Sequence, residues 1–239
     1  MIPLASLYAV IVEDFDEELT SLKDLVQIAK TAPPRTRVAT IHATTLILAA
    51  AFEEFIRQMA RAYAVQVVKR SCSISDVPNT ILTTAWKRTF EEISSSKWSE
   101  DDKRSTYQVV AKRARVKIDA LCAFMEGDIS QDIFDSLIHN ERNMRVGEIN
   151  RMFKISGLSN ICMEICKQES LKQFFGQEDG HHTHGHLLSA IKRFIDLRNE
   201  IAHSLNPSIS NAPEEVFRLL DMFRAFAKDL SATLEADTE

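Results

Sequence analysis

Hydrophobic residues recur every three or four positions along most of the chain, which is the spacing that gathers side chains on one face of an α-helix. The clearest example is a stretch in the N-terminal third that predicts one buried stripe: Ile41, Thr45, Leu48, Phe52, Phe55, Met59 and Tyr63. Alternating runs of strand length are scarce, and the 239 residues include only six glycines and six prolines. We therefore predict an all-α fold.

Breaks in this pattern divide the chain into helices. Pro33 and Pro34 separate a first helix over residues 4–30 from a long second one over residues 36–70, because proline does not continue a helix. Further helices are expected in the following places: through Trp86 and Phe90, from residues 99–102 to residue 125, and over residues 133–138, 146–155, 161–175, 185–202 and 213–234. Without a repeat or a flexible linker, one domain over residues 1–239 is the simplest interpretation.

The cysteines and the N-terminal sequence indicate in which cellular compartment the protein is expected. The four cysteines form no CxxC pair, and a chain of this size needs no disulfide framework. No positive charge precedes the acidic stretch that begins at Glu13, so a secretory signal is not expected. The longest uncharged apolar run, residues 41–52, falls short of the roughly 20 residues that span a bilayer. We therefore predict a soluble, cytoplasmic protein with no membrane partner.

The formal net charge of −5 argues against a protein that binds nucleic acid over its whole surface. Charge is nevertheless segregated, because no acidic residue interrupts the segment between Lys103 and Lys117. The candidate RNA-binding residues in this segment are Lys112, Arg113, Arg115 and Lys117. A solvated helix face remains the alternative interpretation.

Two charged residues fall where the helical pattern calls for apolar side chains. Arg198 interrupts an apolar stripe near the C-terminus that consists of Leu187, Leu188, Ile191, Phe194, Ile195, Ile201 and Ala202. Glu53 occupies an apolar position of the long second helix, whereas Glu54 aligns with polar residues. Because an unpaired buried charge is costly, we predict that Glu53 and Arg198 form a pair. A purely structural salt bridge is the alternative to a functional one.

Asn199 and His203 are four residues apart and therefore share a helix face next to Arg198. Glu200 lies one turn before His203 and is a supporting residue, because its carboxylate and the negative end of the helix favour a positive imidazole. Histidine can act as a general acid or base, and arginine can stabilise negative charge on a phosphate. Arg198, Asn199 and His203 are therefore the candidate catalytic residues. The same face also carries Lys192 and Asp196.

The motif RNEIAH at residues 198–203 resembles the signature of the HEPN superfamily, an arginine, often followed by asparagine, and then a histidine after a short spacer. Three stretches are similar to its RiboL-PSP-HEPN branch: AAAFEEFIRQMA at residues 49–60, INRMFKISGLSNI at 149–161 and LRNEIAHS at 197–204. The resemblance implies an antiparallel helical bundle with additional helices, and a homodimer that brings two motifs together. It also implies RNA cleavage without a metal, in toxin–antitoxin or antiphage defence.

One position departs from the family pattern. Many HEPN toxins carry a tyrosine shortly after the motif histidine, where a partner nucleotidyltransferase can modify it, whereas this chain has Leu205. Control by that route is not expected, although an antitoxin or another defence protein remains an expected partner. Two functions stay open, an endoribonuclease and a non-catalytic HEPN module for RNA binding or protein assembly. The intact set of Arg198, Asn199 and His203 favours the endoribonuclease.

A histidine-rich tract precedes the motif and contains His181, His182, His184 and His186. Such a tract can bind zinc or nickel, but a structural zinc site usually draws ligands from two separate segments. Because we expect these histidines to lie in one loop, we predict adventitious binding and no metal site. No Gly-rich phosphate loop, GxSxG or HExxH motif is present, and no cofactor is expected.

Overall fold

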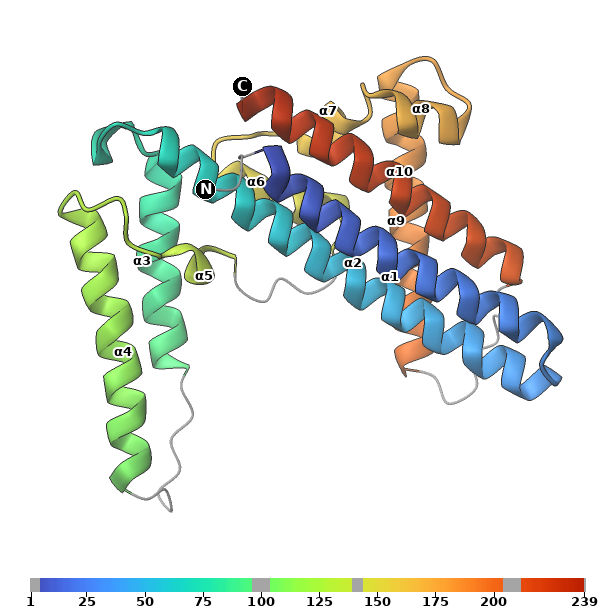
Figure 1. Ribbon diagram of the computed structural model, residues 1–239, viewed down its shortest axis with the longest axis horizontal. Coiled ribbons are helices and arrows are strands. Elements are labelled where there is room, and N and C mark those ends of the chain that lie inside the picture. Colours follow the sequence, from blue (N-terminus) through green and yellow to red (C-terminus); the bar gives the residue numbers. More distant parts are fainter. Residues whose placement is uncertain (1–4, 96–103, 139–143, 204–211, 239) are drawn as a thin grey trace. The chain divides into compact units, whose positions relative to one another are not determined.

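The computed structural model describes residues 5–95, 104–138, 144–203 and 212–238 (Figure 1). Within these ranges the chain forms ten α-helices, one short 3-10 helix and no strand. The prediction of an all-α fold is therefore confirmed. The helices are α1 (Ala5–Thr31), α2 (Pro34–Arg70), η1 (Ile74–Asp76), α3 (Asn79–Ser94), α4 (Arg104–Met125), α5 (Phe134–Leu137), α6 (Val146–Ile155), α7 (Ile161–Ile165), α8 (Glu169–Phe175), α9 (Gly180–His203) and α10 (Pro213–Thr238).

Most helices lie within a few residues of their predicted ranges, but the single helix expected over residues 161–175 is two helices, α7 and α8. The buried carboxylate of Asp229, on α10, caps the start of α8. It accepts hydrogen bonds from the backbone N–H groups of Ser170 at 3.2 Å and Leu171 at 2.7 Å. Because these amides are satisfied by a side chain from another helix, the chain can begin a new helix here. The helix start expected at residues 99–102 lies outside the described ranges.

The described chain divides into two compact units. The first contains Met1–Met59, Arg142–Asn150 and Asn160–Glu239, and the second contains Ala60–Glu141 and Arg151–Ser159. Helix α2 begins in the first unit and ends in the second. The single domain expected from the sequence stays a prediction.

Helices α1, α2, α9 and α10 build the core of the first unit. Helices α1 and α10 run antiparallel, because Arg224 contacts Asp16 near the middle of both helices, whereas Glu214 at the start of α10 lies 3.1 Å from Lys30 at the end of α1. The predicted stripe of α2 is buried along its whole length. Aromatic contacts join three of these helices: Phe52 of α2 lies 4.3 Å from Phe223 of α10, and Phe223 lies 5.0 Å from Phe194 of α9, between ring centroids. These contacts hold the apolar face of α9 against the core.

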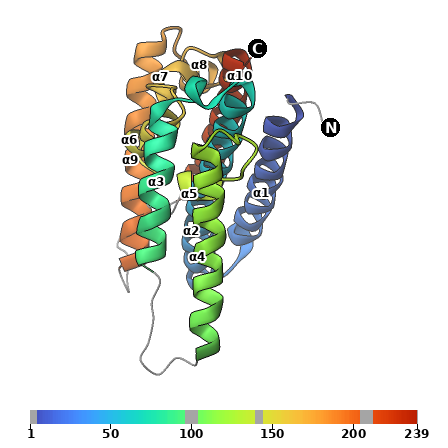
Figure 2. The ribbon, with the colours of Figure 1, turned by 90° about the vertical axis from the view of Figure 1, so that its left-hand side faces the viewer.

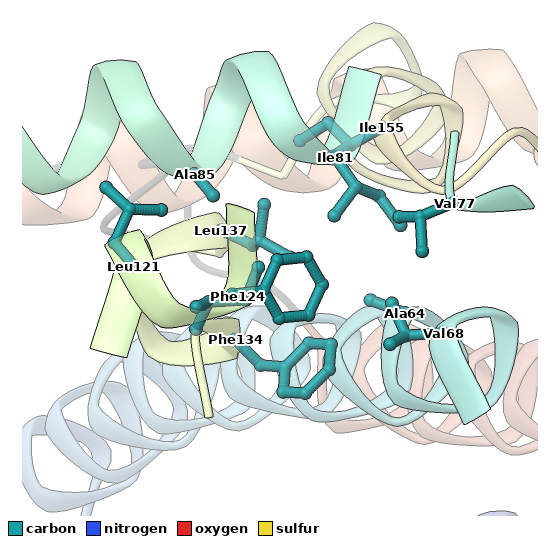
Figure 3. Packing of buried hydrophobic residues seen from close by; sticks show 11 residues of the cluster. Ala64, Val68, Val77, Ile81, Ala85, Leu121, Phe124, Phe134, Leu137 and Ile155 are labelled. Carbon is teal, nitrogen blue, oxygen red and sulfur yellow. The ribbon is translucent and has the colours of Figure 1, made fainter. Parts of the chain in front are cut away.

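The second unit has an apolar core of its own, to which α2, α3, α4 and α5 contribute (Figure 3). Its largest side chains are Phe124 and Phe134. Polar contacts at its edge link separate segments, since Thr80 donates to the carbonyl oxygen of Ile155 at 2.7 Å and Lys117 of α4 pairs with a carboxylate of α3. This unit carries the basic segment predicted from the sequence.

One helix in the described part of the chain, α2, is long and apolar enough to cross a membrane, judged by length and composition alone. This differs from the sequence analysis, which counted uncharged runs, whereas an average over 18 residues tolerates an occasional charge. Half of that apolar window is buried inside the protein. A buried core helix meets the same criterion, and the cytoplasmic location stays a prediction.

Candidate active site

Helix α9 carries the motif and packs its apolar face against the core. The stripe is buried at Leu187, Ile191, Phe194, Ile195 and Ile201. Leu188 and Ala202 are exposed, contrary to expectation. Leu188 lies about 100° around the helix axis from the buried Leu187, and Ala202 lies in the last turn of α9. The buried face is therefore narrower than the sequence pattern indicated.

Arg198 is half-buried on the core-facing side of α9. Its Nη1 donates a hydrogen bond to Oδ1 of the half-buried Asn199 at 3.0 Å. An arginine stem can pack on apolar neighbours while the guanidinium reaches polar partners. The structure thus brings two of the three predicted catalytic residues into direct contact.

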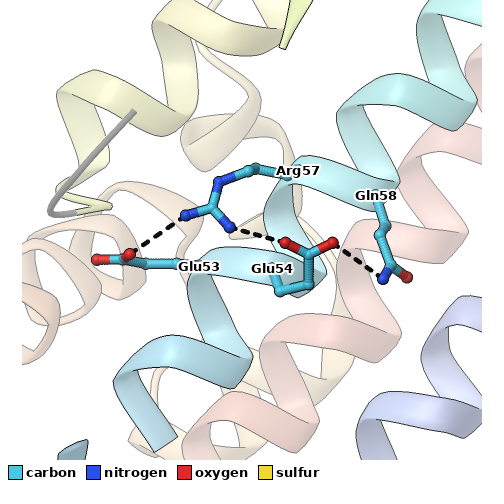
Figure 4. A network of polar contacts seen from close by, with 4 residues as sticks. All are labelled: Glu53, Glu54, Arg57 and Gln58. Carbon is cyan, nitrogen blue, oxygen red and sulfur yellow. Dashed lines mark hydrogen bonds and ion pairs between the residues drawn. The ribbon is translucent and has the colours of Figure 1, made fainter. Parts of the chain in front are cut away.

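Glu53 is buried, with 8% of its surface exposed, as its place in the apolar stripe predicts. Its Oε2 lies 3.3 Å from Nη2 of Arg57, one turn further along α2. Nη1 of the same guanidinium lies 2.8 Å from the exposed Glu54, so Arg57 bridges the two carboxylates (Figure 4). Arg57 is not among the site residues predicted from the sequence. The pairing of Glu53 with Arg198 stays a prediction.

A polar stripe runs along α9 into the motif and consists of Lys192, Asp196, Asn199 and His203, spaced by three or four residues. Asp196 is held from two sides, by Nζ of Lys192 at 2.9 Å and by Nη2 of Arg145 at 2.8 Å. These hydrogen bonds, from Lys192 first, lower the pKa of Asp196. His203 is exposed and is the last residue of α9, so a substrate can reach its imidazole.

Arg145 is a residue of this region that the sequence analysis missed. It lies 51 positions before Asp196, directly before α6, and no local periodicity connects the two segments. Its contact places a second cation beside the polar stripe, one to two helical turns from Asn199 and His203. Cations at this distance favour the approach of a polyanion such as RNA.

The basic segment of α4 belongs to the second unit, whereas the motif belongs to the first. Arg115 lies 3.5 Å from Asp119, and Lys117 pairs with Glu92. Lys112 and Arg113 are exposed, and among the described residues neither is paired with a carboxylate. A role in RNA binding stays a prediction for all four basic residues.

The histidine-rich tract is helical, so the expected loop is wrong. His181, His182, His184 and His186 lie in the first turns of α9. The helix begins before the histidines because Oδ2 of Asp179 accepts a hydrogen bond from the backbone N–H of His182 at 3.0 Å. The same hydrogen bond lowers the pKa of Asp179. Burial, followed by the nearby His181, lowers the pKa of His184. Within the described ranges, no group of three or more His, Cys, Asp or Glu side chains is arranged to hold a metal ion.

Leu205, the position that departs from the family pattern, lies outside the described residues.

Searches of curated proteins and of solved structures found no match. A family model for RiboL-PSP-HEPN matches residues 13–236, which include the motif at residues 198–203 and nearly all of the helices described above. The chain therefore belongs to the RiboL-PSP-HEPN family, and its domain is of the HEPN type.

Proposed function

We propose that this protein is a metal-independent endoribonuclease whose active site combines the Arg198, Asn199 and His203 motifs of two chains. The observation that carries the proposal is the end of α9, where the guanidinium is bound to Asn199 and an exposed histidine follows one turn later. Membership of a HEPN-type family supports this activity. Toxin–antitoxin or antiphage defence in the cytoplasm is the setting that we propose, with an antitoxin or defence protein as a further partner.

The reaction follows from these side chains. The 2′-hydroxyl of the RNA attacks the adjacent phosphorus, so that a P–O2′ bond forms while the P–O5′ bond breaks. His203 exchanges a proton with the attacking 2′-oxygen or the leaving 5′-oxygen. Arg198 stabilises the charge on the pentavalent phosphate, and Asn199, which accepts a hydrogen bond from that guanidinium, orients the scissile group. Because the nucleophile belongs to the RNA, no metal-bound water is required.

The products distinguish this mechanism from hydrolysis by water. We expect cleavage of a single-stranded RNA into fragments that end in a 2′,3′-cyclic phosphate and begin with a 5′-hydroxyl, with the same rate in EDTA. A DNA of the same sequence should stay intact, since it lacks the 2′-hydroxyl. Mass spectrometry of the fragments identifies the ends. Equal cleavage of the DNA, or RNA binding without cleavage, would instead favour a HEPN module for binding or assembly.

A second prediction concerns the oligomeric state. One motif supplies a single histidine, whereas cleavage profits from both an acid and a base, so two chains are expected to place their motifs together across a two-fold axis. We expect a homodimer in light scattering at micromolar concentration, and a loss of specific activity when dilution dissociates it. A protein that stays monomeric and still cleaves RNA at an undiminished rate would contradict the composite site.

A further inference from the structure

A cavity of about 550 Å³ lies in the first unit between α8, α9 and α10. Helix α8 lies against the N-terminal half of α9 in both ribbon views (Figure 1, Figure 2). The side of the cavity formed by α9 includes Arg193, Asp196 and Glu200. Glu200 is three residues before His203, so their Cβ atoms lie roughly 5–6 Å apart. Pockets for small ligands commonly measure about 300–1,000 Å³, so this one suits a single nucleotide that lies next to the motif.

Aromatic rings form one wall of the cavity. Phe174 and Phe175 of α8 are half-buried, and their ring centroids lie 4.9 Å apart. The Phe175 ring stacks on the imidazole of His186 at 5.7 Å, with 20° between the planes. Single-stranded nucleic acids bind proteins by stacking their bases on such rings, and this stacking tolerates every base. The wall therefore suits a planar nucleobase.

Two arginines supply positive charge at the same cavity. Arg193 comes from α9 and Arg218 from α10, and both are exposed. Within the described part of the chain, neither forms an ion pair with a carboxylate, and Cζ of Arg218 lies 5.9 Å from the centroid of the Phe174 ring. Arginine binds phosphate with paired N–H groups. The guanidinium groups are therefore placed to receive a backbone phosphate.

Three carboxylates also line the cavity: Asp196, Glu200 and Glu215. The charge of Asp196 is offset from outside by Lys192 and Arg145. Ionised carboxylates only accept hydrogen bonds. They match the two N–H donors of the exocyclic amino groups of adenine, guanine and cytosine, whereas uracil offers only its single ring N3–H. The polar lining therefore favours an amino-bearing base.

We infer that this cavity holds one nucleotide of the RNA strand beside the scissile phosphate, an inference that rests on the proposed ribonuclease function. The base lies against Phe174 and Phe175, and its phosphate contacts Arg193 and Arg218. Adenine, guanine and cytosine are preferred to uracil. A free mononucleotide presents the same chemistry, so the test has separate arms for RNA and for AMP.

The test measures the affinity of labelled oligo(A), oligo(C) and oligo(U) RNA by fluorescence anisotropy, in the His203→Ala background so that the strands stay intact. Arg218→Gln is expected to weaken oligo(A) binding about tenfold, as for a lost charge-assisted hydrogen bond. Arg193→Gln gives an independent variant with the same expectation. Lys228→Gln is the matched control, because Lys228 is exposed on the same helix and lies outside the cavity lining. It should change the affinity less than about twofold.

The RNA series and AMP test the identity of the ligand. Oligo(U) should bind several-fold more weakly than oligo(A) and oligo(C) to the parent, and Arg218→Gln should reduce this difference. In the active protein, Arg218→Gln should raise KM for RNA with little change in kcat. Equal binding of all oligomers, or an unchanged affinity in both arginine variants, would overturn the inference. So would tight, Arg218-dependent binding of AMP without a matching effect on RNA.

Failure of this inference is distinguishable from failure of the proposed function. If His203→Ala stops cleavage but both arginine variants bind RNA as the parent does, the nuclease stands and the nucleotide subsite is wrong. If the arginine variants lose RNA affinity but the parent cleaves no RNA, the subsite stands and the nuclease is wrong. Thermal melting monitored by circular dichroism verifies that each variant is folded.

Discussion

His203→Ala is expected to lower the rate of RNA cleavage by roughly 10²–10⁴-fold, the usual effect of losing a general acid or base. His203 is exposed and ends α9, so its side chain contributes little to the core and the variant should stay folded. The affinity for RNA should change little, because the cations beside the polar stripe are retained. Single-turnover cleavage of a labelled single-stranded RNA measures the rate, and anisotropy measures the affinity.

His181→Ala is the matched control for this experiment. His181 is also an exposed histidine of α9, but it lies in the first turn, at the opposite end of the helix from the motif. Its replacement should leave cleavage unchanged. Full activity in His203→Ala would remove the proposed acid or base, and HEPN-type binding or assembly would then be the better explanation of the fold.

Local patterns predicted most helices, because the spacing of apolar residues directly reflects which face of a helix meets the core. Helix α6 occupies the predicted residues 146–155, and every predicted position of the α2 stripe is buried. The break between α7 and α8 was not predictable in this way. It depends on Asp229, which lies 58 residues from Leu171 in the sequence and meets it only after α10 has packed.

In the candidate site, too, the residues within one helix were predictable and the contacts between distant segments were not. Arg198 was identified because it stands in an apolar stripe, and Asn199 and His203 because a helix of known period places them together. Arg145 reaches the polar stripe from a segment 51 residues away, and the cavity needs α8, α9 and α10 at once. These are tertiary contacts, and the spacing of residues within one helix does not predict them.

Glu53→Ala is expected to lower the free energy of unfolding by roughly 3 kcal/mol, because it takes a buried carboxylate away from Arg57 and from its predicted partner Arg198. The side chain of Glu53 is 10% exposed and that of Arg57 is 24% exposed. Nε of Arg57 is buried without a hydrogen-bond partner, so the guanidinium already depends on its Nη contacts. Urea unfolding followed by circular dichroism measures the change.

Glu54→Ala is the matched control, since Glu54 binds the same guanidinium at 2.8 Å but its side chain is 55% exposed. An exposed ion pair contributes at most about 1 kcal/mol, so this variant should unfold nearly as the parent does. Equal destabilisation by the two variants would mean that burial does not set the strength of these contacts.

Double-mutant cycles decide which arginine Glu53 supports. A coupling energy above about 1 kcal/mol between Glu53→Ala and Arg57→Ala is expected from their direct contact. The pairing predicted from the apolar stripes requires a similar coupling between Glu53→Ala and Arg198→Ala, together with a loss of RNA cleavage in Glu53→Ala. Coupling to Arg57 alone, with cleavage retained, would confine Glu53 to the stability of α2. Coupling to both arginines would join the carboxylate on α2 to the catalytic guanidinium on α9, so that one buried charge stabilises the fold and positions the active site.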